Sequence, residues 1–164
     1  MTEIETGIRA AFKDVRLDGG LSLSEAAGVD NRAVEKLRAL PAGRDTDDWS
    51  ALSCEMLDDY PVLAYMNAEG FRCYIPAFII SVLTQYVPGS MRVSSTLSSL
   101  YPKRSENWDY SMKQYSLLTR KQREAIAAFL AGLSAEVELD GEDQKVVERA
   151  LRNYWHEFLV TASA

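Results

Sequence analysis

The side chains that most often perform catalysis are few in this sequence and lie far apart. It contains one histidine, His156, and two cysteines, Cys54 and Cys73. A catalytic triad needs a histidine beside a nucleophile and a carboxylate, and no serine lies in a G-x-S-x-G segment. A zinc site needs several cysteine or histidine ligands, and no glycine-rich phosphate loop occurs. We therefore expect no metal and no cofactor, and we favour binding over catalysis.

A pair of polar side chains in the middle of the chain offers a different chemistry. Arg72 and Tyr74 lie in the segment EGFRCYIPAF, next to Glu69 and Gly70. An arginine can grip an anionic ligand through its planar guanidinium group. The alternative is that Arg72 makes an ordinary ion pair at the edge of, or across, a pair of strands. The first interpretation makes Arg72 and Tyr74 the polar lining of a small-molecule pocket.

The main charge asymmetry lies between residues 101 and 123. This window holds six basic and two acidic side chains, a local charge of +4 (6 − 2), whereas the whole chain carries −6. Aromatic residues are interleaved with the cations, and the candidate binding residues here are Lys103, Arg104, Trp108 and Tyr110. Three interpretations remain open. The aromatic residues belong to the core and the cations are solvated, or the window is a hot-spot patch for a protein partner, or it contacts phosphates and stacks on bases.

The stretch over residues 60–90 predicts the centre of the scaffold that positions these side chains. Residues 62–66 and 71–75 are strand-compatible runs, and residues 67–70 between them have the composition of a turn. We therefore predict an antiparallel hairpin. Pro76 suits the first position of a following helix. The residues after it are apolar nearly all round, which indicates a buried helix.

Helical patterns on both sides of this stretch complete the predicted fold. Amphipathic spacing predicts helices over residues 3–16 and 22–40, at 49–59 and 94–100, from 119 onward and from 140 to the last turn near 158. Thr119 and Gln122 match a capping box, and one of Asp45, Asp47 and Asp48 is expected to cap the helix at 49. The predicted class is α+β. It is a mainly helical single domain over residues 1–164, with five or six helices around a small antiparallel β-hairpin.

The string EGFRCYIPAF resembles a central segment, of the EGFRFYLPA type, in a family of small bacterial proteins known only as a domain of unknown function. The pair Asp48-Trp49, the helix over residues 117–130 and the closing A-L-x-x-Y-W at 150–155 fit the same pattern, so the resemblance spans most of the chain. It implies a shared fold and a bacterial cytosolic origin, and it implies no activity. The sequence departs from the pattern at Cys73, where an aromatic is usual, and at Arg120-Lys121, where Pro-Glu is common.

The composition of the chain indicates its cellular location and makes some classes of binding partner unlikely. At 164 residues the chain can bury a sizeable core. Its net charge of −6 and its pI near 4.9 argue against nucleic acid and against an anionic membrane as partners. No apolar run reaches transmembrane length, and the first residues lack a signal pattern. Two cysteines cannot make a disulfide framework. We therefore expect a cytoplasmic protein.

These observations lead to two functional expectations. The first is a non-catalytic bacterial cytosolic protein that acts by binding a protein partner. An immunity or antitoxin-like role fits it, because acidic surfaces often mask basic toxins. The alternative is a small-molecule-binding protein or enzyme with a pocket near Arg72 and Tyr74, so that enzymatic activity is left open.

Overall fold

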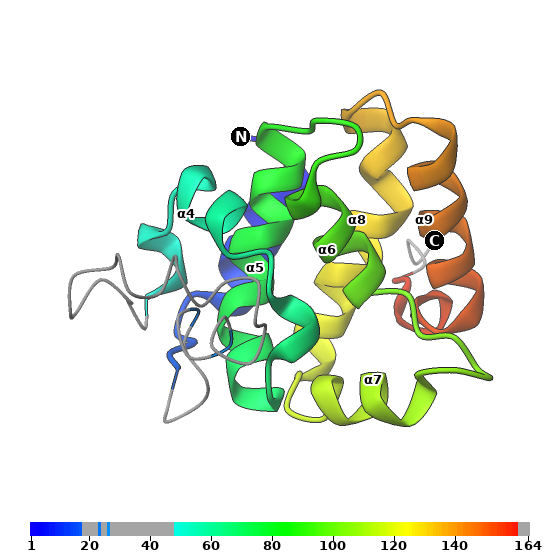
Figure 1. Cartoon of the computed structure of the whole chain (residues 1–164), viewed down its shortest axis with the longest axis horizontal. Helices are drawn as coiled ribbons and strands as arrows, with labels where there is room; N and C mark the ends of the chain where they lie inside the picture. The colour runs from blue at the N-terminus through cyan, green and yellow to red at the C-terminus, as the bar shows by residue number, and fades with distance from the viewer. Residues whose placement is uncertain (18–22, 24–25, 27–47, 161–164) are drawn as a thin grey trace.

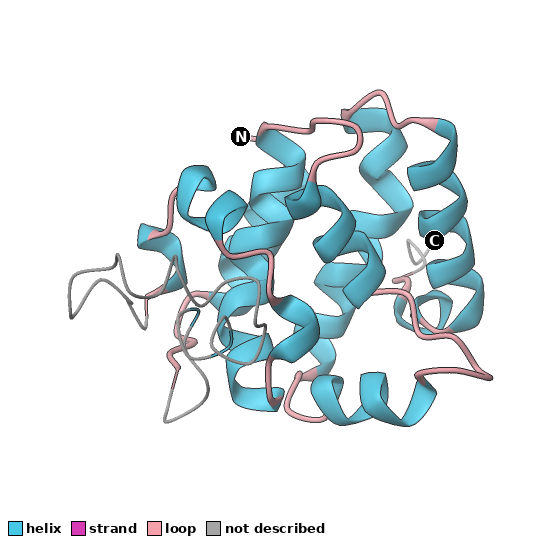
Figure 2. Cartoon of the chain, in the orientation of Figure 1, coloured by secondary structure: helices cyan, strands magenta, loops and turns pink. Residues whose placement is uncertain are grey.

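The computed structural model describes residues 1–17, 23, 26 and 48–160, and every regular element in these residues is a helix (Figures 1 and 2). The labels follow Figure 1. The elements are α1 (Glu3–Phe12), η2 (Trp49–Ala51), α4 (Cys54–Asp59), η3 (Leu63–Tyr65), α5 (Ala68–Thr84), α6 (Met91–Ser99), α7 (Trp108–Tyr115), α8 (Arg120–Glu136), α9 (Gly141–Asn153) and η4 (Trp155–Phe158), where η marks a short 3-10 helix. The predicted helix over residues 22–40 lies outside the described residues.

The predicted β-hairpin is wrong, and with it the α+β class. The first expected strand is largely η3, and the second lies inside α5, which runs from Ala68 to Thr84. The supposed turn is the start of this helix, because the Asn67 side chain accepts a hydrogen bond from the Gly70 N–H at 3.0 Å. Turns and helix starts favour asparagine for the same reason, since its oxygen satisfies a free backbone N–H in both. The segment 67–70 therefore fits either structure.

Pro76 lies inside α5 and not at its start. A proline in a helix interior removes one backbone hydrogen bond and costs about 3 kcal/mol. Burial of one large apolar side chain contributes about 1.5–3 kcal/mol, and α5 buries several. Its fully buried members include Phe71, Ile75, Phe78 and Ile79. The apolar burial of α5 therefore outweighs the cost of its proline.

Helix α5 lies at the centre of the molecule. It packs against α1, α4, α6, α7, α8 and the turns η2 and η3, and Figure 1 shows it between α4 on one side and α6 and α8 on the other. Helix α9 lies outside this layer and packs on α8 and α6. The prediction of a buried central helix is confirmed, although the helix begins eight residues before Pro76.

A buried arginine closes the C-terminal end of α5. The Arg92 side chain, on α6, is only 2% exposed. Its guanidinium donates to the backbone carbonyls of Ser81 and Gln85, each at 2.9 Å, and to the Asp58 carboxylate at 2.8 Å. The last carbonyls of a helix have no partner within it. Arg92 supplies these partners and joins the end of α5 to α6 and to α4.

The helix starts predicted from capping patterns are confirmed, but the helix predicted over residues 49–59 is divided into η2 and α4. Thr119 and Gln122 form both hydrogen bonds of a capping box at the start of α8, and Asp140 caps α9. Asp48 caps η2, and its hydrogen bonds with the Ser50 side chain and backbone lower the pKa of its carboxyl. Asp45 and Asp47 lie outside the described residues. No helix in the described ranges is both long and apolar enough to cross a membrane.

The Asn67 cap can be tested by substitution. We predict that Asn67→Ala lowers the free energy of unfolding by about 1 kcal/mol, whereas Asn67→Gly lowers it by only a few tenths, because glycine is tolerated at an N-cap and alanine is not. Urea denaturation measures both values. Equal losses for the two variants would contradict a cap at this position.

The Arg92 contacts predict a much larger effect. Arg92→Met keeps an unbranched side chain but leaves the carbonyls of Ser81 and Gln85 without charged donors, and we expect a loss of about 3 kcal/mol in unfolding free energy. The matched control is Arg120→Met, because the Arg120 side chain is 73% exposed in its pair with Glu124 and such surface pairs are worth about 0–1 kcal/mol. Similar losses of unfolding free energy in the two variants would contradict a stabilising role for the hydrogen bonds of Arg92.

Candidate functional site

The structure divides the basic and aromatic window into a buried part and an exposed part. Tyr115, at the end of α7, is fully buried. Its ring centroid lies 5.0 Å from that of Trp155, 5.5 Å from that of Tyr154 and 5.4 Å from that of Phe71. Burial raises the pKa of the Tyr115 hydroxyl, which donates to the backbone carbonyl of Ser99. For Tyr115 the interpretation as core is confirmed.

Arg123 belongs to the same interior region. Its guanidinium donates to the Tyr154 hydroxyl at 2.6 Å, to the Tyr115 carbonyl at 2.8 Å and to the Leu118 carbonyl at 3.1 Å. A cation in the first turn of α8 is unfavourable for the dipole of that helix. Arg123 instead reaches back to the C-terminal end of α7, where a cation is favourable. Its position in the sequence is explained by this contact with the preceding helix.

The exposed part of the window lies at the start of α7. Arg104 stacks over the Trp108 ring at 4.9 Å, and the edge of Trp108 packs on Tyr154 with centroids 6.0 Å apart. Lys103 pairs with Glu106 at 3.4 Å, and both side chains are exposed. Tyr110 follows on α7. We give the name α7 face to the surface formed by the exposed Lys103, Arg104 and Tyr110 and the partly buried Trp108.

Tyr110 is held rigidly although it is 50% exposed. Its hydroxyl donates to the backbone carbonyl of Ala64, in η3. Burial of this hydroxyl raises the pKa of Tyr110, and the neighbouring Tyr65 adds to the effect. One turn later the buried Gln114 side chain donates to the carbonyls of Leu63 and Met66, at 3.0 and 2.9 Å. Helix α7 is thus fixed to η3 by two side chains on one face.

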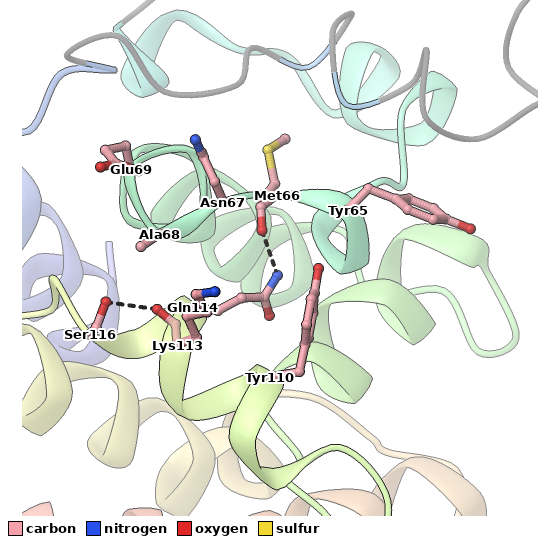
Figure 3. Close-up of a pocket in the computed structure, with 9 residues that line it drawn as sticks. All are labelled: Tyr65, Met66, Asn67, Ala68, Glu69, Tyr110, Lys113, Gln114 and Ser116. Atoms are coloured by element: carbon pink, nitrogen blue, oxygen red, sulfur yellow. Dashed lines mark hydrogen bonds between the residues drawn. The ribbon is translucent and has the colours of Figure 1, made fainter.

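A cleft of about 470 Å³ lies between α7 and the segment that leads into α5 (Figure 3). Residues 65–69 form one wall, and Tyr110, Lys113, Gln114 and Ser116 form the other. We call it the α5–α7 cleft. A second hollow of about 430 Å³ lies over residues 104–110. Tyr110 lines both, so it stands between the cleft and the rest of the α7 face.

Four of the six candidate binding residues come together, and two do not. Lys103, Arg104, Trp108 and Tyr110 share the α7 face. Arg72 is half-buried on α5, and Tyr74 is fully buried there. Neither residue lines the α5–α7 cleft. The reason is the change of element: on a helix these positions turn toward α5's packed neighbours, whereas on a strand they would share a face.

The cleft-lining residues Tyr65, Gln114 and Ser116 were not predicted as site residues. The sequence offered one signal, since Lys113 lies in the basic window and Glu69 in the central segment. Their meeting depends on α7, and no helix was predicted between residues 100 and 119. Asparagine is a common N-cap residue, but the Asn107 side chain makes no cap hydrogen bond at the start of α7.

The described residues hold no group of three or more His, Cys, Asp and Glu side chains that could ligate a metal ion. His156 is exposed, and its Nδ1 lies 3.0 Å from the Leu151 carbonyl oxygen. Cys73 is a buried free thiol on α5, and Cys54 a partly buried one at the start of α4. The two cysteines therefore act as small side chains that fill space between helices.

Comparison with known proteins places the chain in one family. The model of a family described as "Family of unknown function (DUF6714)" matches residues 1–159. The match confirms the resemblance to an uncharacterised family. A comparison with curated proteins and a comparison with solved structures each return no match.

The buried tyrosine hydroxyl makes stability dependent on pH. Because the pKa of Tyr115 is raised above its ordinary value of 10.0 in the folded state, its contribution is present below pH 10 and is lost as the pH rises. We predict that the unfolding free energy falls above pH 10 by up to about 1.4 kcal/mol per pH unit for each such tyrosine. Denaturant titrations of wild type and Tyr115→Phe measure this, and the variant should fall less steeply. If the unfolding free energies of the two proteins fell equally with pH, the raised pKa of Tyr115 would be contradicted.

Proposed function

We propose that this protein, which belongs to the family of unknown function DUF6714, acts by binding a protein partner through the α7 face. The observation that carries the proposal is the fixed position of two aromatic groups at the surface, the exposed Tyr110 and the partly buried Trp108. Tyr110 is half exposed, yet its hydroxyl is bonded to the Ala64 carbonyl. Trp108 is fixed between the Arg104 guanidinium and the Tyr154 ring.

Rigid presentation favours binding because ordering a free side chain at an interface costs about 0.5–1.5 kcal/mol. In this protein the two aromatic side chains are already ordered before a partner binds, so binding loses less conformational entropy. Trp, Tyr and Arg are also the residues most often found among interface hot spots. The α7 face combines all three within seven consecutive residues, 104–110.

The charge of the rest of the chain suggests the kind of partner. Outside residues 101–123 the chain carries −10, since the total is −6 and the window is +4. A strongly acidic protein attracts a basic partner over a distance and raises the rate of association. We therefore propose a cytoplasmic protein partner that is basic overall but acidic or apolar where it meets Lys103 and Arg104 of the α7 face. An immunity or antitoxin-like role is the working hypothesis. No catalytic step forms part of the proposal.

The experiment captures partners of the tagged protein from a lysate of its source organism and identifies them by mass spectrometry. Wild type is compared with Trp108→Ala and with the double variant Lys103→Glu/Arg104→Glu. The complex is then rebuilt from purified proteins. We expect the loss of a hot-spot residue to cost about 2 kcal/mol or more, which weakens binding about 30-fold.

The matched control is Lys13→Glu/Arg149→Glu, which makes the same charge change at exposed positions just after α1 and on α9, outside the α7 face. Affinity should be retained, or slightly raised, by this control. A partner held equally by the wild type and by all variants would place the interface elsewhere. A lysate without any stoichiometric partner would contradict the binding function itself.

A further inference from the structure

The α5–α7 cleft has two chemically different ends. In Figure 3, Tyr65 and Tyr110 lie at one end, and Glu69, Lys113 and Ser116 lie toward the other. Met66 and Gln114 lie between them. Such a cleft is suited to a ligand that has an aromatic group at one end and charged groups at the other.

The two charged side chains of the cleft are not neutralised. Glu69 comes from the start of α5 and Lys113 from α7. Neither side chain makes an ion pair or a hydrogen bond within the described part of the chain, whereas exposed cations elsewhere do, such as Lys103 and Arg120. The Lys113 ammonium and the Glu69 carboxylate lie on opposite walls and do not pair with each other. A ligand can therefore form an ion pair with each of them.

The walls of the cleft are fixed before any ligand arrives. Gln114 holds η3 and the residue Met66 against α7 through hydrogen bonds of 3.0 and 2.9 Å, and the Tyr110 hydroxyl is bonded to Ala64. The volume of about 470 Å³ lies toward the small end of the usual range for ligand sites, about 300–1,000 Å³. The site therefore suits a small molecule and needs no large closure.

We propose that the α5–α7 cleft binds a small aromatic zwitterion, an aromatic α-amino acid. Its carboxylate pairs with the Lys113 ammonium and its ammonium pairs with the Glu69 carboxylate. Its ring lies at the tyrosine end, against Tyr65 and Tyr110, where aromatic rings attract one another in offset or edge-to-face packing. This binding is non-covalent and does not require the protein partner proposed above.

The test is isothermal titration calorimetry of the purified full chain with L-phenylalanine. Three analogues each remove one recognised feature: 2-phenylethylamine lacks the carboxylate, 3-phenylpropionate lacks the ammonium, and L-alanine lacks the ring. We expect saturable binding of L-phenylalanine and at least about tenfold weaker binding of every analogue.

Substitutions in the cleft provide the second arm. Lys113→Gln and Glu69→Gln each remove one charge while keeping a polar side chain, and each should weaken the binding of L-phenylalanine at least about tenfold. The matched controls are Lys121→Gln and Glu136→Gln, exposed residues of α8 that do not line the cleft. They should bind as the wild type does.

Two results would overturn the proposal. One is the absence of saturable binding of L-phenylalanine at about 10 mM. The other is equal binding of an analogue that carries only one charge, which would show that the cleft does not read a zwitterion. Because the titration uses the isolated protein, either result leaves the α7 face untouched as a partner site, and failure to capture a partner leaves the cleft untouched.

Discussion

A buried central helix still has to find partners for the free backbone N–H and C=O groups at its two ends. In this fold that helix is α5. Asn67 accepts a hydrogen bond at its start, and Arg92 donates to two carbonyls at its end. The same arginine reaches Asp58, just before the C-terminal end of α4. The arginine that caps α5 therefore also links α4 and α6 to the end of the central helix, in addition to their buried apolar contacts.

The exposed surface that we propose as functional follows from the position of α5. The chain enters α5 through η3, and the carbonyls of η3 and Met66 are the acceptors for Tyr110 and Gln114 on α7. At the C-terminal end of α7, the Tyr115 carbonyl accepts a hydrogen bond from Arg123, which also donates to the Tyr154 hydroxyl. Helix α7 has no strong pattern of its own and is held by these side-chain contacts with its neighbours. Its outward residues are ordered for the same reason.

In the window over residues 101–123, basic and aromatic residues form part of the core at some positions and part of the surface at others. Tyr115 and Arg123 face inward, where the ring packs among aromatic neighbours and the guanidinium binds carbonyls. Arg104 is exposed and stacks on the partly buried Trp108. In sequence these residues look alike, since each is a cation or an aromatic within a short polar stretch. The packed cluster of Tyr115, Tyr154 and Trp155 gives the outward pair a rigid base.

Local residue patterns were sufficient to predict several helix starts and the buried helix. The capping box at Thr119, the acidic start of α9 and the apolar character of α5 each depend on residues only a few positions apart, so they could be predicted without the fold. The tertiary structure decided between turn and N-cap at Asn67, because both use the same side-chain oxygen. It also decided that Tyr74 is core, that α7 forms, and that Glu69 and Lys113 share a cleft. These outcomes depend on contacts between segments far apart in the chain, such as Gln114 with Leu63, and no local pattern carries that information.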